Sequence, residues 1–179
     1  CYAFSYYYAE LACARMLVEL NQTMLPEGEL LPAQEEAILK RVDQIQQQEG
    51  LMLDELQRKA VLESVRNSIL ILTGGPGTGK TTTINTIIRY FEGEGLDLYL
   101  AAPTGRAAKR MTEATGYEAR TIHRMLELSG AMPESGKKAS FERNEDNPLE
   151  ADVIIVDEMS MVDIHLFQSL LKAVSPGTR

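Results

Sequence analysis

The chain has 179 residues, 44% of them hydrophobic, which is enough for one domain with its own core but leaves room only for a small appendage. Its formal net charge is −8, which taken alone argues against a nucleic-acid partner. Cys1 and Cys13 fit no metal-binding or redox spacing, and Glu10 and Arg15 interrupt the first apolar stretch, which excludes a secretory signal or a membrane span. We therefore expect a cytoplasmic protein without disulfides or membrane contact.

Three helices are predicted before the first strand. Apolar residues recur at helical spacing over residues 2–22, and a second helical run follows Pro32 over residues 33–48. A third helix is expected to begin at Asp54, whose carboxylate can accept hydrogen bonds from first-turn amides, and to end near Asn67. Gln57, three residues after Asp54, fits a capping box in which its amide returns to the backbone N–H of the cap.

The strongest motif lies between a predicted strand at residues 69–72 and a helix of about a dozen residues that Gly93 and Gly95 end. The string Gly74-Gly75-Pro76-Gly77-Thr78-Gly79-Lys80-Thr81 matches the pattern G-x-x-x-x-G-K-[ST]. Its glycines let successive amides surround phosphate oxygens at a helix N-terminus. We expect Lys80 to contact the β- and γ-phosphates, Thr81 to bind Mg²⁺, and Thr82 to complete the nucleotide contacts.

A basic segment follows. A strand is predicted at residues 96–101 and a helix at 104–115. Between Ala101 and Leu128 the sequence has five basic residues and three acidic ones. The basic residues are Arg106, Lys109, Arg110, Arg120 and Arg124; the acidic ones are Glu113, Glu118 and Glu127. A polyanion would prefer this segment to the rest of the chain. Residues 129–150 are expected to form a loop or a short hairpin.

Two acids follow the last predicted strand, at residues 153–156, before a helix-like run at 164–174. Asp157 and Glu158 would lie at the carboxyl edge of a parallel sheet, where ligands of such sheets bind. We expect Asp157 to hold a Mg²⁺-bound water and Glu158 to orient and deprotonate the attacking water. Because strands alternate with helices, the fold class is predicted as α/β, with a parallel sheet covered on both faces.

Five stretches together resemble the first motor domain of RecD-like DNA helicases of superfamily 1. They are LDELQRKAV at 53–61, LTGGPGTGKTTT at 72–83, LAAPTGRAAKRM at 100–111, TIHRML at 121–126 and IIVDEMSMVD at 154–163. The resemblance implies a RecA-like P-loop NTPase domain over residues 51–179, cut short after the acid pair. Residues 1–50 would then be the end of an N-terminal helical domain.

The resemblance also assigns roles. It implies that Gln57 recognises adenine, as an alternative to the capping box, and that Thr104, Arg106 and His123 contact single-stranded DNA. It implies ATP as substrate, 5′→3′ movement, a role in DNA repair or recombination, and a second motor domain that this chain lacks. The fragment itself is expected to be a weak ATPase without unwinding activity. An AAA+ ATPase and a non-catalytic nucleotide-binding module are the alternatives.

Overall fold

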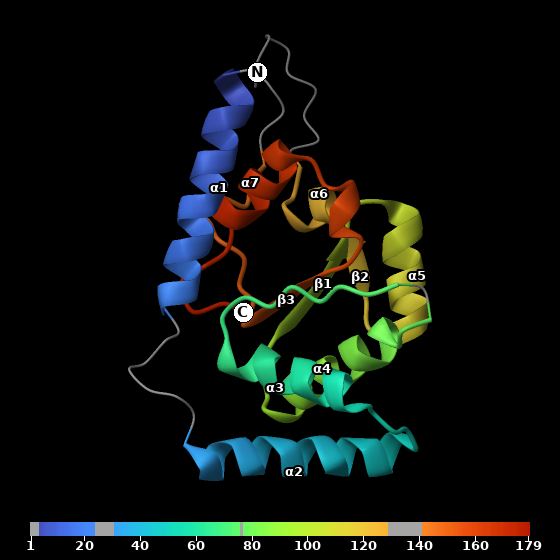
Figure 1. Ribbon diagram of the computed structural model, residues 1–179. Coiled ribbons are helices and arrows are strands. Elements are labelled where there is room, and N and C mark those ends of the chain that lie inside the picture. Colours follow the sequence, from blue (N-terminus) through green and yellow to red (C-terminus); the bar gives the residue numbers. More distant parts are fainter. Residues whose placement is uncertain (1–3, 24–30, 76, 129–140) are drawn as a thin grey trace.

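A computed structural model describes residues 4–75, 77–128 and 141–179, except for residues 24–30 (Figure 1). Its centre is a parallel sheet of three strands, β1 (Leu98–Ala102), β2 (Ala119–Thr121) and β3 (Val153–Val156), in the order β2-β1-β3. Helices pack against the sheet, so the predicted α/β class with a parallel sheet flanked by helices is confirmed. Within the described residues, no helix is long and apolar enough to cross a membrane.

Local sequence sets the helix boundaries. The first two helices are α1 (Phe4–Thr23) and α2 (Pro32–Glu49); Pro32 begins α2, and Gly50, with φ +64°, ends it. Then come α3 (Glu55–Arg66), α4 (Lys80–Gly93) and α5 (Gly105–Thr115). The chain continues with the short α6 (Ile122–Met125), the 3-10 turn η1 (Met159–Met161) and α7 (Ile164–Lys172). The predicted helices at 2–22, 33–48, 54–67 and 104–115 correspond closely to α1, α2, α3 and α5.

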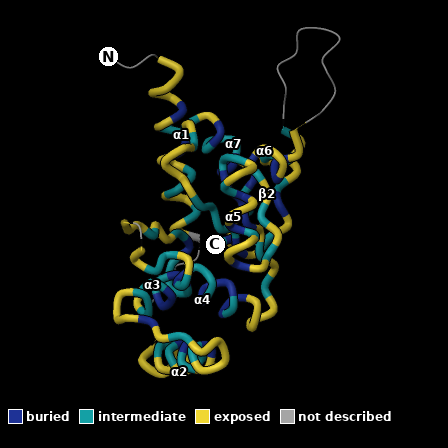
Figure 2. The backbone as a smooth tube through the Cα atoms, turned by 90° about the vertical axis from the view of Figure 1, so that its right-hand side faces the viewer, coloured by how far each residue is buried: buried dark blue, intermediate teal, exposed yellow. Residues whose placement is uncertain are grey.

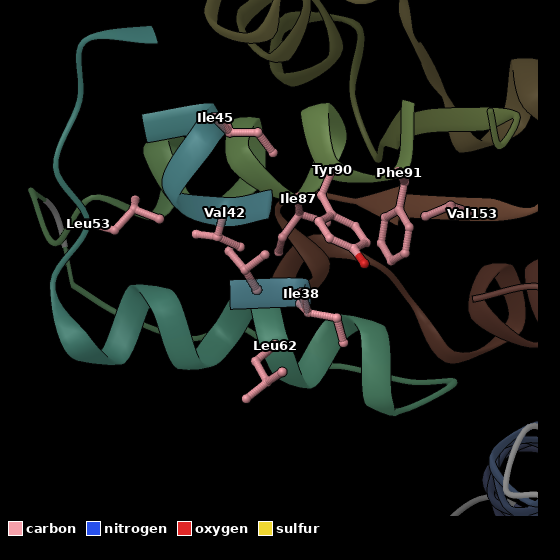
Figure 3. Close-up of a cluster of buried hydrophobic side chains, with 10 residues drawn as sticks. Ile38, Val42, Ile45, Leu53, Leu62, Ile87, Tyr90, Phe91 and Val153 are labelled. Carbon is pink, nitrogen blue, oxygen red and sulfur yellow. The ribbon is translucent and has the colours of Figure 1, made fainter. Parts of the chain in front are cut away.

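One face of the sheet is covered by α2, α3 and α4. Val153 of β3 packs with Tyr90 and Phe91 of α4, and apolar residues of α2 and α3 complete this cluster (Figure 3). A smaller cluster joins Ile88 of α4, Leu100 of β1 and Met111 of α5. Burying a side chain of this size stabilises the fold by about 1.5–3 kcal/mol, so this layer fixes α4 and the loop that precedes it.

The opposite face is covered by α6 and α7. Ala101 of β1 packs with Ile122 of α6 and Leu166 of α7, so residues alternate along β1 between the two faces. Beyond this layer α1 lies alongside α7, where the Cys13 thiol is 3.9 Å from the carbonyl oxygen of Ile164 (Figure 1). Figure 2 shows that much of the outer surface of α1 and α2 is exposed.

The strand predicted at residues 69–72 is wrong. These residues form no β-ladder, and the Ile71 side chain is 82% exposed. A strand requires hydrogen bonds from a neighbour, and the free edge of β3 bonds to Arg179 instead. The Ile154 N–H donates to the Arg179 carbonyl at 2.8 Å, and the Arg179 N–H donates to the Asp152 carbonyl at 2.9 Å. Residues 69–72 have the residue types of a strand but no pairing partner among the described residues, and the local pattern alone cannot report that a partner is missing.

Smaller differences concern the segments after β1. The strand predicted at residues 96–101 is β1, displaced toward the C-terminus, while β2 and α6 were not predicted. Residues 129–140 of the predicted loop lie outside the described part; its remainder forms isolated bridges between Leu128 and Phe141 and between Asn144 and Asn147.

The domain boundary predicted at residue 50 falls between α2 and α3, which share one apolar cluster. The division into two domains stays a prediction.

Candidate nucleotide-binding site

The glycine-rich loop is held together by its own polar groups. The Lys80 ammonium, at the start of α4, donates hydrogen bonds to the carbonyl oxygens of Gly74 and Gly75 at 2.5 and 2.8 Å. The Thr78 hydroxyl donates to the Gly75 carbonyl at 2.9 Å. Pro76 lies outside the described residues. The loop thus curls around the lysine, and the cation lies among its carbonyl oxygens.

Backbone conformation explains two of the glycines. Gly77 and Gly79 have φ values of +75° and +76°, a region that other residues rarely adopt. A Cβ atom at Gly79 would also stand 2.1 Å from Nε2 of Gln57. Gly79 is the N-cap of α4, so this close approach brings Gln57 to the N-terminal end of the helix. The contact joins the motif around residue 57 to the phosphate loop.

Gln57 makes the predicted capping box. The Asp54 carboxylate accepts from the Gln57 N–H at 2.8 Å, and Gln57 Oε1 accepts from the Asp54 N–H at 2.9 Å. Gln57 Nε2 lies 3.4 Å from the Thr78 carbonyl oxygen. A carboxamide oxygen has two lone pairs and its nitrogen two hydrogens, so the box and the contact with Thr78 together leave one of each for a ligand. The box and a base contact are therefore compatible.

Two threonines follow Lys80 in the first turn of α4. Thr81 is exposed, and within the described residues its hydroxyl has no hydrogen-bond partner. Thr82 is half-buried, and its carbonyl oxygen accepts from the Thr86 hydroxyl at 2.9 Å. The Thr81 hydroxyl is thus free to face an ion or a phosphate at this helix end, where the helix dipole favours negative charge.

The acid pair lies where β3 ends. The Asp157 N–H donates to the Ala101 carbonyl of β1 at 3.0 Å, and its carboxylate accepts from the Glu158 N–H at 2.8 Å. Glu158 is exposed and has φ +55°, a left-handed conformation that is uncommon outside glycine and concentrates at functional sites. In the described chain, no hydrogen bond or ion pair joins these acids to the glycine-rich loop.

The candidate Mg²⁺ ligands are hard oxygen donors. Thr81 offers a hydroxyl and Asp157 a carboxylate with one oxygen outside the hydrogen bond to Glu158. The described residues hold no group of three or more His, Cys, Asp or Glu that could bind a metal. Mg²⁺ is commonly held by one or two protein oxygens together with phosphate and water.

The candidate DNA contacts lie at the same edge of the sheet as the acids. Thr104 follows β1 and caps α5, where its hydroxyl oxygen accepts from the Ala107 N–H at 3.2 Å. Arg106 is exposed and has no ion-pair partner among the described residues. His123 follows β2, is exposed, and has its ring centroid 5.9 Å from that of Phe141. Because the strands are parallel, their carboxyl ends bring these segments to one edge.

Comparison with known proteins identifies the family. Residues 57–179 match the family described as AAA domain. The chain is 42% identical over 127 residues to the ATP-dependent RecD2 DNA helicase of Deinococcus radiodurans, covering 71% of this chain and 17% of that protein. It is 37% identical to the RecBCD enzyme subunit RecD of Mycolicibacterium smegmatis, and 34% identical to that of Haemophilus influenzae. These matches cover 70% and 69% of this chain.

The chain spans only 26% and 22% of those two RecD subunits, so it corresponds to a part of each relative. The predicted resemblance to RecD-like helicases is confirmed by these relatives. The matched region begins at Gln57 and includes the phosphate loop, β1 to β3 and the acid pair. The chain belongs to the AAA domain family.

Proposed function

We propose that this chain is the ATP-binding and ATP-hydrolysing motor domain of a DNA helicase. The observation that carries the proposal is the phosphate loop at the start of α4 together with an acid pair at the end of β3, in a chain similar to RecD helicases. We further propose 5′→3′ movement on single-stranded DNA, a role in DNA repair or recombination, and a cytoplasmic location. The similarity to proteins named as helicases favours this function over a protein-remodelling AAA+ ATPase.

Nucleotide binding would begin with an exchange of partners at Lys80. Its ammonium leaves the carbonyl oxygens of Gly74 and Gly75 and bonds to the β- and γ-phosphates, which are stronger acceptors because they are charged. The amides of the glycine-rich loop and the first turn of α4 surround the phosphates. Thr81 and Asp157 would hold Mg²⁺, which when bound would supply positive charge at the phosphate oxygens. Gln57 selects adenine with the lone pair and the hydrogen that remain after the capping box and the contact with Thr78.

Hydrolysis would depend on Glu158. The residue carries an exposed carboxylate directly after the Mg²⁺-side aspartate, and its left-handed backbone turns the chain out of the strand direction at that point. In this role the Glu158 carboxylate orients a water molecule and accepts its proton. The water oxygen bonds to the γ-phosphorus, and the bond from that phosphorus to the bridging oxygen breaks, so that ADP leaves. A nucleotide kinase needs no such carboxylate, because its acceptor is another substrate.

Single-stranded DNA would be bound by Thr104, Arg106 and His123 at the carboxyl edge of the sheet. An arginine and a threonine hydroxyl are suited to phosphate oxygens, and contacts of this kind position a strand without reading its sequence. The chain is acidic overall, so we expect this binding to be weak at physiological salt. We expect the chain alone to hydrolyse ATP slowly and to unwind no DNA, because it corresponds to part of its relatives.

The test is the variant Glu158→Gln, which keeps the shape of the side chain but cannot accept a proton. ATP binding is measured by calorimetry, and hydrolysis is followed in single-turnover assays with and without single-stranded DNA. We expect unchanged ATP affinity and a loss of hydrolysis of about 10²-fold or more.

The matched control is Glu145→Gln, because Glu145 is an exposed carboxylate that pairs with Lys172 at 2.9 Å. Hydrolysis by Glu158→Gln at the wild-type rate would refute the catalytic assignment. Tight ATP binding by a wild-type chain with no hydrolysis at all would favour the non-catalytic binding module.

A further inference from the structure

The turn between α2 and α3 is held by side chains of α2. Gln46 Oε1 accepts a hydrogen bond from the Leu53 N–H at 2.8 Å, just before the cap of α3. Gln46 Nε2 donates to the Asp43 carboxylate at 2.9 Å, which fixes the direction of the Gln46 amide. Two consecutive turns of α2 therefore hold the backbone at residue 53 in place.

Asp43 also reaches α3 directly. The same carboxylate oxygen that accepts from Gln46 forms an ion pair and hydrogen bond with Nη1 of Arg58. The Arg58 side chain is 29% exposed and that of Asp43 49%, so the pair is partly shielded from water. The hydrogen bond from Arg58 lowers the pKa of Asp43, which keeps the carboxylate charged. Asp43 and Gln46 thus hold both sides of the α3 N-terminus, at residues 53 and 58.

Gln57 lies between these two anchored positions. Its Oε1 is bound by the Asp54 N–H, next to the anchored Leu53, and its backbone is next to the anchored Arg58. Its Nε2 reaches the loop at Thr78 and leaves no room for a side chain at Gly79. The orientation of the Gln57 carboxamide therefore depends on a continuous series of bonds that begins in α2.

We propose that Asp43 and Gln46 are positioning residues for nucleobase selection, acting through the α3 N-terminus on the Gln57 carboxamide. The inference rests on the proposed role of Gln57 in binding adenine. It places a determinant of base choice in α2, outside residues 57–179 that match the AAA domain family. A base contact is sensitive to such positioning because both hydrogen bonds to the adenine edge need the correct amide plane.

The experiment compares the affinities of ATP and GTP for the whole chain by competition with a fluorescent nucleotide. The variants are Gln46→Ala, Asp43→Asn and Gln57→Ala, with thermal melting to confirm that each is folded at the assay temperature. We expect Gln57→Ala to reduce the ATP-to-GTP affinity ratio by about tenfold, for two lost hydrogen bonds. Gln46→Ala and Asp43→Asn should each reduce it by about threefold to fivefold, with GTP affinity nearly unchanged.

Two controls separate positioning from general stabilisation of α2. Glu49→Gln breaks an ion pair of α2 with Arg89 of α4, 3.3 Å long and similarly exposed, that has no bond to the 51–58 segment. It should leave the ratio unchanged even if it lowers the melting temperature. In the Gln57→Ala background, Gln46→Ala should have no further effect on the ratio, because the group that it positions is gone.

The outcomes distinguish this inference from the proposed function. If Gln57→Ala changes the ratio but Gln46→Ala and Asp43→Asn resemble Glu49→Gln, the positioning inference is wrong and the role of Gln57 stands. The inference is equally refuted if Gln46→Ala lowers the ratio to the same extent with and without Gln57. If Gln57→Ala leaves the ratio unchanged, the adenine contact itself is wrong and the inference fails with it.

Discussion

Replacing Lys80 by alanine tests the phosphate loop most directly. In the structure the ammonium makes two hydrogen bonds to loop carbonyls, at 2.5 and 2.8 Å. When the ammonium bonds to a phosphate it must give up these two hydrogen bonds. A hydrogen bond involving a charged group contributes about 1.5–3 kcal/mol. Because the carbonyl bonds must be given up, we expect the lower end, about 1.5 kcal/mol, which is about a tenfold increase in the Kd for ATP.

The assay is isothermal titration calorimetry with ATP in the presence of Mg²⁺, and again in excess EDTA. Lys172→Ala is the matched control, since its ammonium pairs with Glu145 at 2.9 Å in another part of the surface. We expect the control to bind ATP with wild-type affinity. Excess EDTA should weaken ATP binding by the wild type and by the Lys80 variant alike, because Thr81 and Asp157, the proposed Mg²⁺ ligands, remain in both. An unchanged Kd for Lys80→Ala would refute the assignment of the loop as a phosphate site.

Three further predictions concern the scaffold. Gln57→Ala should lower the melting temperature as well as the preference for ATP. The melting temperature falls because the Asp54 N–H loses its partner, at a cost of about 1 kcal/mol. A lower melting temperature with an unchanged preference for ATP would mean that Gln57 acts only as a helix cap. Ile88 is fully buried, so Ile88→Ala should reduce the free energy of unfolding in urea by about 2–5 kcal/mol. Ile71 is 82% exposed, so Ile71→Ala should leave this free energy nearly unchanged. A similar loss of stability in both variants would contradict the described core. The pKa of Asp43 is lowered in the folded state, so the unfolded chain binds more protons and stability falls as pH drops below about 4; acid melting curves of Asp43→Asn should show a smaller fall.

The sequence predicted the phosphate loop and the capping box well because both are local. Each depends on groups within a few residues of one another, so glycine positions, a lysine and an Asp-x-x-Gln spacing are enough to specify them. The contact between Gln57 and the loop is different, since Thr78 lies 21 residues further along the chain. Only the packing of α3 against α4 brings them together, and no periodicity reports that packing.

The wrong strand at residues 69–72 has a related cause. A run of β-branched and other apolar residues indicates a backbone suited to a sheet, but pairing depends on which edge is available. Here Arg179 bonds to the free edge of β3. Conversely, β2 has only three residues, too few for any alternation to be recognised, although it carries His123 to the carboxyl edge. Whether the short strands form therefore depends on partners far away in the sequence, whereas the long helices are determined by their local sequence.

One hydrogen bond across the sheet has a mechanical consequence. The Asp157 N–H is bonded to the Ala101 carbonyl, and Ala101 is separated from Thr104 by only a short turn at the end of β1. A load applied to the segment after β1 is thus passed to the backbone of the acid pair without an intervening flexible loop. If single-stranded DNA binds at Thr104 as proposed, tension on the DNA would act through this hydrogen bond on the backbone that carries the two carboxylates. In the proposed motor, this bond would couple DNA binding after β1 to the position of the catalytic acids at the end of β3.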